Sequence, residues 1–213
     1  MALTPLIPSS IPPRSFELIR DQIVAILATE LASQHSLNNA YPNVVKVWGE
    51  RFIPINSETE TPTVNVSVAK GNYDNITIAK ADGDYIYNID IYTSAPSSVA
   101  NGPGDQFAMM TMNKIVGMIW AILSSPAYNG VNNVLLLPGI IIGAEVQSFA
   151  VLYRGEDGAE DSLSDVVGRL KFCVRANETA VLINTGNALN ESTATVLLEG
   201  SEYGFFYNIN TTE

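Results

Sequence analysis

Histidine and cysteine are almost absent from the chain, whose 213 residues include one of each. A single cysteine excludes an internal disulfide framework, and the two residues together do not supply the Cys/His sets that bind zinc. Most catalytic triads use a histidine base, so hydrolases of that kind are disfavoured as well. The composition therefore disfavours zinc enzymes and hydrolases with a histidine base.

Positive charge is also scarce. Lys and Arg number 11 against 22 Asp and Glu, which gives a formal net charge of -11. A protein that binds nucleic acid tightly neutralises its phosphates with Lys and Arg. The charge balance therefore disfavours tight nucleic-acid binding, and it favours a surface that repels phosphates.

The chain lacks an uninterrupted apolar run of the ~20 residues that a membrane-spanning helix requires. Its longest apolar stretch, 107–123, is interrupted by polar or small residues, so we expect a soluble protein with no membrane contact. Residues 1–14 contain four prolines and no Lys or Arg before Arg14. This pattern favours an extended N-terminal arm over an export signal.

The hydrophobic content of 46% is sufficient for one sizeable core, which we place in a domain over residues 15–175. The spacing over 15–33 predicts an amphipathic helix with Ser15 as its N-cap and Glu17 near its positive end. Its apolar residues fall in one stripe, which we expect to be buried while the other face meets water. The stripe comprises Phe16, Ile19, Ile23, Ile26, Leu27 and Leu31.

A second helix is expected over 105–125, after the breaker Asn-Gly-Pro-Gly at 101–104. Apolar residues spread over most of its circumference, so nearly all of it must be covered. Either the domain holds this helix between two of its own layers, or a neighbouring subunit supplies the second cover. We favour the subunit. The residues expected at that subunit interface are Phe107, Met110, Ile115, Met118, Ile119, Trp120 and Ile122.

Alternating apolar residues predict strands over 63–68 and 85–91, and 44–52 is a third candidate. After the second helix, 146–153 and 167–174 are expected to pair as a hairpin. The apolar run 134–142 is broken by Pro138 and Gly139, which indicates an edge strand or a loop. The sequence thus predicts an α+β fold: a mainly antiparallel β-sheet packed against two helices, in the order α-β-β-β-α-β-β.

The composition changes after Arg175. Residues 176–213 include five acidic residues and no Lys or Arg, with three short strand-like pieces at 180–183, 193–198 and 203–209. A segment of this size cannot form a stable core alone. We therefore expect an acidic β-rich C-terminal extension that adds to the main sheet or packs on a partner.

Neither the reactive side chains nor the motifs of the chain predict an enzyme. His35 is an ordinary polar residue near a helix C-terminus, and Cys173 is more typical of an inert buried thiol, although nearby Arg and Lys residues would favour the thiolate. The acidic cluster that ends at Asp165 does not match a calcium loop, so we interpret it as a solvated turn. No spacing indicates a phosphate loop, a nucleophile elbow or a dinucleotide site. We therefore predict no catalytic residues, no cofactor and no metal.

The order of elements over 15–174 resembles that of the tail terminator (tail completion) proteins of long-tailed bacteriophages: an amphipathic helix, three strands with a long loop among them, a hydrophobic helix and a closing hairpin. The resemblance implies a structural virion protein of the tail or neck, assembled in the host cytoplasm. It implies a hexameric ring that caps the tail tube protein and meets the head-tail connector, with DNA passing through the lumen without specific binding. The extension at 176–213 departs from the smaller members of that family.

Two loops are expected to contact the tube or the connector. They are 54–62, with Glu58 and Glu60, and 156–165, with Glu156, Asp157, Glu160 and Asp161. Two alternatives stay open: another tail or neck component, such as a tube subunit or a head-completion protein, and a ligand-binding or enzymatic domain whose apolar helix is its own two-sided core.

Overall fold

The computed structural model describes residues 10, 13–38, 44–51, 60–74, 82–96, 104–130, 133–153 and 164–178, together with the strands 191–197 and 204–210. The chain divides into two compact units, Pro13–Val181 and a second one of Met1–Pro12 with Leu182–Glu213.

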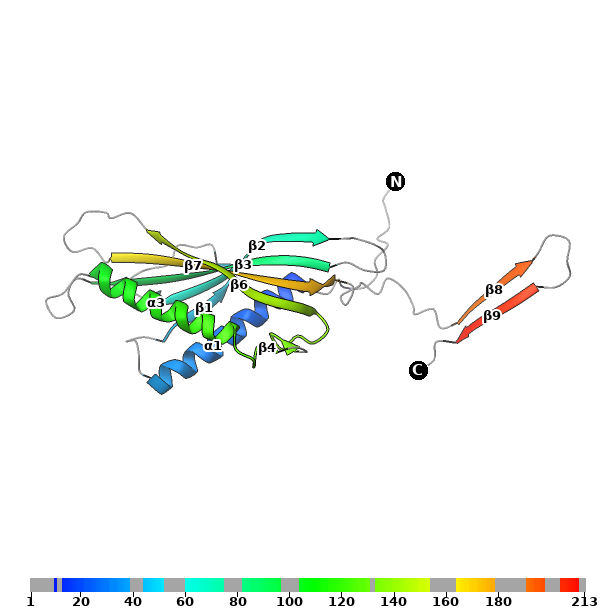
Figure 1. Ribbon diagram of the computed structural model, residues 1–213, viewed down its shortest axis with the longest axis horizontal. Coiled ribbons are helices and arrows are strands. Elements are labelled where there is room, and N and C mark those ends of the chain that lie inside the picture. Colours follow the sequence, from blue (N-terminus) through cyan, green and yellow to red (C-terminus); the bar gives the residue numbers. More distant parts are fainter. Residues whose placement is uncertain are drawn as a thin grey trace. The chain divides into compact units, whose positions relative to one another are not determined.

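The first unit has the expected α+β fold (Figure 1). Its five-stranded sheet has the order β1-β2-β3-β7-β6, and it is mixed because β1 runs parallel to β2 while the other pairs are antiparallel. The elements are α1 (Ser15–Asn38), β1 (Lys46–Gly49), β2 (Thr63–Asp74), β3 (Asp82–Ala95), α3 (Gly104–Leu123), β4 (Asn129–Gly130), β5 (Asn133–Val134), β6 (Ile141–Tyr153) and β7 (Ser164–Asn177).

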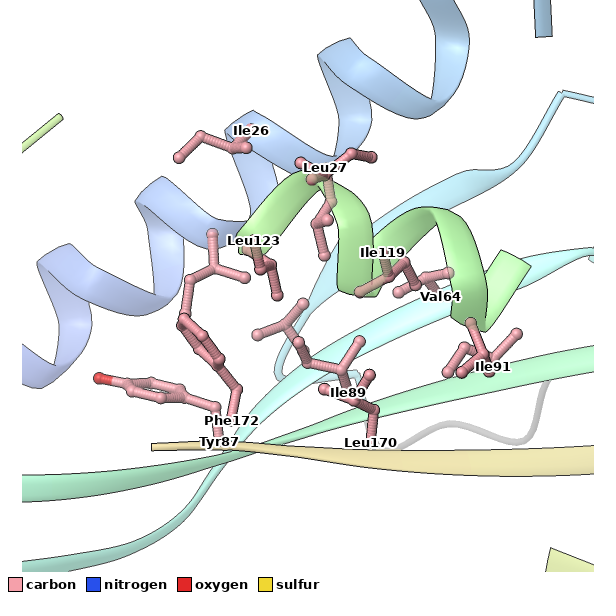
Figure 2. Packing of buried hydrophobic residues seen from close by; sticks show 14 of the residues in the cluster. Ile26, Leu27, Val64, Tyr87, Ile89, Ile91, Ile119, Leu123, Leu170 and Phe172 are labelled. Atoms are coloured by element: carbon pink, nitrogen blue, oxygen red, sulfur yellow. The ribbon is translucent and has the colours of Figure 1, made fainter. Parts of the chain in front are cut away.

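Both helices lie on the same face of the sheet, which we call the helix face (Figure 1). α1 packs on β1 and β2, whereas α3 packs on β3 and β7. Alternate residues of the central strands are buried beneath the helices, as the period of two requires. Figure 2 shows Ile119 and Leu123 of α3 above Ile89, Leu170 and Phe172 of the sheet.

Three hydrogen bonds from side chains fix the helix layer in place. The Tyr87 hydroxyl donates to the carbonyl of Phe16 at 2.9 Å, and the Thr93 hydroxyl donates to the carbonyl of Ala108 at 2.9 Å. The Tyr128 hydroxyl, just after α3, donates to a Glu30 carboxylate oxygen of α1 at 2.5 Å. Each contact satisfies a polar group that the apolar core could not.

The start of α1 differs from the expectation. Arg14 is the N-cap: its carbonyl accepts from the backbone N–H groups of Glu17 and Leu18, and its own N–H donates to the Glu17 carboxylate at 2.8 Å. This is the return half of a capping box. Ser15 is the first helical residue, and its buried hydroxyl has no hydrogen-bond partner. α1 also continues past Ser33 to Asn38.

The apolar run 134–142 forms a tight turn before the edge strand. Leu135 and Leu136 both have positive φ, 51° and 57°, and the N–H of Leu137 donates to the carbonyl of Val134 at 3.0 Å. Two such residues in a row define a primed turn, which Leu adopts only under strain. Leu135 is fully buried, so its packing offsets that strain.

The second unit contains a two-stranded antiparallel ribbon, which we call the C-terminal ribbon: β8 (Glu191–Leu197) and β9 (Gly204–Asn210). The sequence predicted strands at 193–198 and 203–209, and the structure has them. The strand-like piece at 180–183 lies outside the described residues. β8 and β9 form a two-stranded sheet.

Gly168 of β7 allows α3 to approach the sheet closely. A Cβ atom there would lie 2.6 Å from Met112 Sδ and 3.1 Å from Phe149 Cε2. Because Met112 is itself fully buried, we expect Gly168→Ala to lower the free energy of unfolding by about 1–3 kcal/mol. Denaturant unfolding monitored by circular dichroism measures this change.

Gly117 provides the matched control, since a Cβ atom at this exposed helical position meets nothing within 4 Å. Gly117→Ala should raise the free energy of unfolding by up to about 1 kcal/mol. Equal stability of the two variants would contradict the close approach of α3 at Gly168.

Two buried tyrosines of β3 predict alkaline sensitivity. Burial raises the pKa of Tyr87 and, with a hydrogen bond to Glu178, that of Tyr85, above the ordinary value of 10.0. The burial of these neutral hydroxyls therefore stabilises the fold fully below pH 10, and this stabilisation is lost as the pH rises above 10.

Tyr87→Phe should lower the free energy of unfolding by about 1 kcal/mol at neutral pH, because the hydrogen bond to Phe16 is lost. The free energy of unfolding of the variant should also fall less steeply with rising pH than that of the natural protein. A pH series of denaturant unfolding tests this, and parallel curves for the two proteins would refute it.

Candidate functional site

The outward stripe of α3 exposes two large apolar side chains. Met110 is 63% exposed and Trp120 is 49% exposed. Gly117 lies between them in the sequence and is also exposed. Large apolar groups in water forfeit transfer free energy, so they mark a candidate contact surface when they recur on one element. We call Met110 and Trp120 the α3 stripe.

The seven predicted interface residues divide between surface and core. Met110 and Trp120 are exposed, and Phe107 and Met118 are half-buried. Ile115, Ile119 and Ile122 instead lie in the chain's own core. The sheet and α1 thus cover more of α3 than the sequence led us to expect, and the surface that a neighbour could reach shrinks to the other four residues.

α3 is also long and apolar enough, by length and composition alone, to cross a membrane. The core helix of a soluble protein passes the same test. Its buried residues, which include Met112, Ile115 and Ile119, pack over the sheet as in such a core helix.

The helix layer hardly reaches β6, the strand at one edge of the sheet. β6 is 13 residues long and exposes Ile142 (53%), Phe149 (36%) and Leu152 (39%). The opposite edge strand, β1, has only four residues. A long edge strand with exposed apolar side chains is a template for pairing with another chain. β6 is therefore the second candidate contact surface.

The face opposite the helices, which we call the open face, carries an ordered polar array. Directly paired residues of antiparallel strands share a face, and Asp90 of β3 stands between Asn65 of β2 and Arg169 of β7. Arg169 Nε and Nη2 donate to the two Asp90 carboxylate oxygens at 2.6 and 2.8 Å. This hydrogen bond raises the pKa of Arg169. Asp90 is almost fully buried, so the pair is a structural ion pair of the sheet.

Three cations of β7 face small residues of the edge strand. Arg169, Lys171 and Arg175 pair in register with Ala150, Ser148 and Gly143 of β6. Lys171 and Arg175 are exposed, and the nearest carboxylate oxygens to Arg175 are those of Asp82 at 3.8 Å and Asp84 at 4.0 Å. The small β6 residues leave Lys171 and Arg175 exposed, but Arg169 is held by Asp90, and carboxylates of Asp82 and Asp84 lie at ion-pair distance from Arg175.

Of the predicted loop contacts, the structure describes only one residue. Glu60 accepts two hydrogen bonds from Arg51 Nη2, at 3.0 and 2.9 Å. Arg51 also stacks over the ring of Trp48, 5.3 Å from its centroid, which is a cation–π contact. The other five residues, Glu58, Glu156, Asp157, Glu160 and Asp161, lie outside the described residues.

The side chains weighed for chemistry do not gather into a site. Burial, followed by the charges of Asp84 and Glu145, raises the pKa of the Cys173 thiol. The thiolate is thus disfavoured, contrary to the effect expected from the neighbouring Arg and Lys residues. Among the residues that the structure describes, no three His, Cys, Asp or Glu side chains are close enough to hold a metal ion.

The sequence reasoning missed the edge position of β6. The alternation of Arg169, Lys171 and Arg175 was visible in the sequence, but which strand lies beside β7 is a property of the topology. A hairpin prediction pairs 146–153 with 167–174 without saying what covers the other side of either strand.

The Asp90–Arg169 pair should be essential to the sheet. Arg169→Ala leaves a buried carboxylate without its partner, so we expect the free energy of unfolding to fall by about 1–3 kcal/mol. Arg175→Ala, which removes an exposed cation from the same strand, should change it by less than about 0.5 kcal/mol. Chemical denaturation of both variants tests the difference, and equal losses would show that Arg169 has no special role.

No protein family model matches the chain, and no curated protein shows significant similarity to it.

Proposed function

We propose that this protein is a structural subunit of a bacteriophage tail that closes into a ring, caps the tail tube and joins it to the head connector. The observation that carries the proposal is a sheet whose described helices lie on one face and which ends in a long edge strand that they cover only in part. Exposing apolar side chains and an unpaired strand edge to water is unfavourable in free energy, so such a surface is suited to contact with another subunit.

A ring requires two different contact patches on each subunit, because every joint is head-to-tail. The α3 stripe lies on the helix face, and β6 offers an edge together with the cations of the open face. These patches differ in chemistry, one being apolar and the other a strand edge flanked by charged side chains of both signs. This difference supports a heterologous contact over a two-fold dimer.

The negative charge supports the second part of the proposal. A net charge of -11 gives a ring whose lumen repels phosphates, so that DNA slides through without sticking. In this proposal the protein acts in the virion, at the tail or neck, after assembly in the host cytoplasm. Its partners are further copies of itself in a hexameric ring, a tail tube protein and a head-tail connector.

Light scattering and negative-stain electron microscopy of the purified full chain test the proposal. Discrete rings support a terminator. Long helical tubes would replace it with a tail tube subunit, since β6 also suits continuous sheets along a tube. A monomer that stays solitary at high concentration would overturn it and favour a domain that acts alone.

The α3 stripe should be required for the ring. Met110→Asp or Trp120→Asp places a charge in the apolar joint, so we expect a loss of rings at concentrations where the natural protein assembles. Both side chains are exposed, so the thermal unfolding of each variant should stay close to that of the natural protein.

Ile119→Asp is the contrasting variant. Ile119 is fully buried in the subunit core, and an uncompensated charge there should unfold the chain itself. Wild-type-like rings from both surface variants would contradict the role of the α3 stripe.

A further inference from the structure

The five-stranded sheet has two outer edges, β1 and β6, since no other described strand pairs with the outer side of either. Natural edge strands are protected by Lys, Pro or bulges, but β6 contains no Lys, Arg or Pro, and Glu145 is its only charged residue. Register shifts at 141/143 and 146/148 disturb its first half, whereas 148–153 pairs regularly with β7. The second half of β6 is therefore the part that is open to a further strand.

The direction of the backbone groups at the β1 edge follows from the hydrogen bonds inside the sheet. The N–H groups of Lys46 and Glu50 donate to carbonyls of the segment 62–66, so these two residues turn their backbone toward β2. Backbone groups of successive strand residues alternate in direction. Val47 and Gly49 therefore turn their N–H and C=O groups outward, where a further strand would bind them.

The same alternation can be followed across the sheet to its other edge. Since the even-numbered residues at the start of β2 turn toward β1, the odd-numbered ones turn toward β3. By the register of the pairs, Asp90 then turns its backbone toward β2, Arg169 toward β6 and Ala150 toward β7. Phe149 and Val151, on either side of Ala150, therefore turn their backbone groups outward from the edge of β6.

The outward groups of both edges belong to residues of the helix face. Val47 and Gly49 pair with residues of β2 that are buried beneath α1, and Phe149 and Val151 pair with residues of β7 that α3 covers. The two edge strands also run in opposite directions, as the pairings through β2, β3 and β7 require. In subunits that follow one another around a ring axis along the strands, the two edges therefore meet antiparallel, with both helix layers on the same face.

The sizes of the side chains favour one register for this meeting. Trp48 lies on the open face of β1 and is 44% exposed, and Phe149 lies on the helix face of β6 and is 36% exposed. With Trp48 opposite Ala150, Phe149 lies opposite Gly49, so each exposed ring is beside a small residue. A shift by two residues places Trp48 beside the larger Leu152 in one direction, and Gly49 beside the disturbed half of β6 in the other.

We propose that β1 of one subunit adds to the second half of β6 of the next subunit, antiparallel and with Trp48 opposite Ala150, so that the sheets join across the joint of the ring. The four residues of β1 need no more than the six regular residues of β6. The outward backbone groups of both edges then find partners, and Trp48 and Phe149 lose exposed area. The joint is head-to-tail, as a ring requires. This inference rests on the proposed ring and names one of its joints.

A pair of cysteines across the joint tests the register in the full-length protein. In a Cys173→Ser background, Trp48→Cys and Ala150→Cys place thiols at opposite positions, with Cα atoms about 4.5 Å apart and within reach of a disulfide. Because β2, β3 and β7 separate β1 from β6 in one subunit, a disulfide between these positions links two subunits. We expect mild oxidation to give covalent multimers up to the size of the ring, seen on non-reducing gels.

Trp48→Cys with Leu152→Cys, in the same background, is the matched control. In the proposed register these positions are offset by two residues, and their Cα atoms lie about 8 Å apart, beyond the range of an unstrained disulfide. We expect this pair to form cross-linked multimers at least tenfold more slowly than the pair at Trp48 and Ala150.

Proline substitutions in β6 test the backbone part of the joint without cysteine chemistry. Val151→Pro removes an N–H that turns outward, so it leaves the hydrogen bonds of the subunit intact and blocks the added strand. We expect assembly to require at least a roughly tenfold higher concentration, with thermal unfolding close to that of the natural protein. Ala150→Pro removes an N–H that turns toward β7, so it should instead lower the unfolding temperature of the subunit itself.

The possible failures are distinguishable. If the natural protein forms no oligomer, the proposed function falls and this joint falls with it. If the natural protein forms rings and the two cysteine pairs cross-link equally, or neither does, the ring stands and the β1–β6 joint is wrong. Rings of Val151→Pro at the same concentration as the natural protein would also overturn the joint alone.

Discussion

The packing of two helices on a single face of the sheet determines the rest of this structure. Alternate residues of β2, β3 and β7 supply the apolar floor, and α1 and α3 cover it side by side. Two helices are wide enough for four strands, so the fifth strand, β6, extends beyond them. In the described part of the chain, no helix lies on the other face of the sheet, and the sparsely covered edge is a consequence of the core itself.

The open face shows how such a sheet stays stable in water. Its centre is held by the Asp90–Arg169 pair, whose two short hydrogen bonds give a planar, fixed geometry. An almost buried carboxylate needs that partner. Lys171 and Arg175, farther along β7, are more exposed and are not fixed in the same way. The open face therefore has a rigid centre, and its margin beside β6 carries charges of both signs, with Lys171 and Arg175 near Asp82, Asp84 and Glu145.

The sequence predicted the fold class, both helices and the strands of the main sheet, because each rests on a local period. It did not predict the cap at Arg14, since Arg is not among the side chains that favour an N-cap, and the carboxylate that completes the cap belongs to Glu17 in the first turn. It also overestimated the uncovered part of α3. A helical projection gives the direction of Ile119, but only the packing of the chain shows that this side chain lies in its own core. The two charged loops and the N-terminal arm fall largely outside the described residues, so those expectations stay predictions.

The exposed apolar residues of α3 and β6 have to be explained together. Met110 or Trp120 alone would be an ordinary surface residue, since folded proteins expose many apolar atoms. An edge strand of 13 residues with one charged side chain is different, because an unprotected edge is an aggregation hazard to any protein that must remain a monomer. The register shifts in its first half leave only 148–153 in regular pairing with 166–171 of β7. Irregular pairing interrupts the row of backbone groups that a further strand would need, so the first half of β6 carries a natural protection of edge strands and the second half does not.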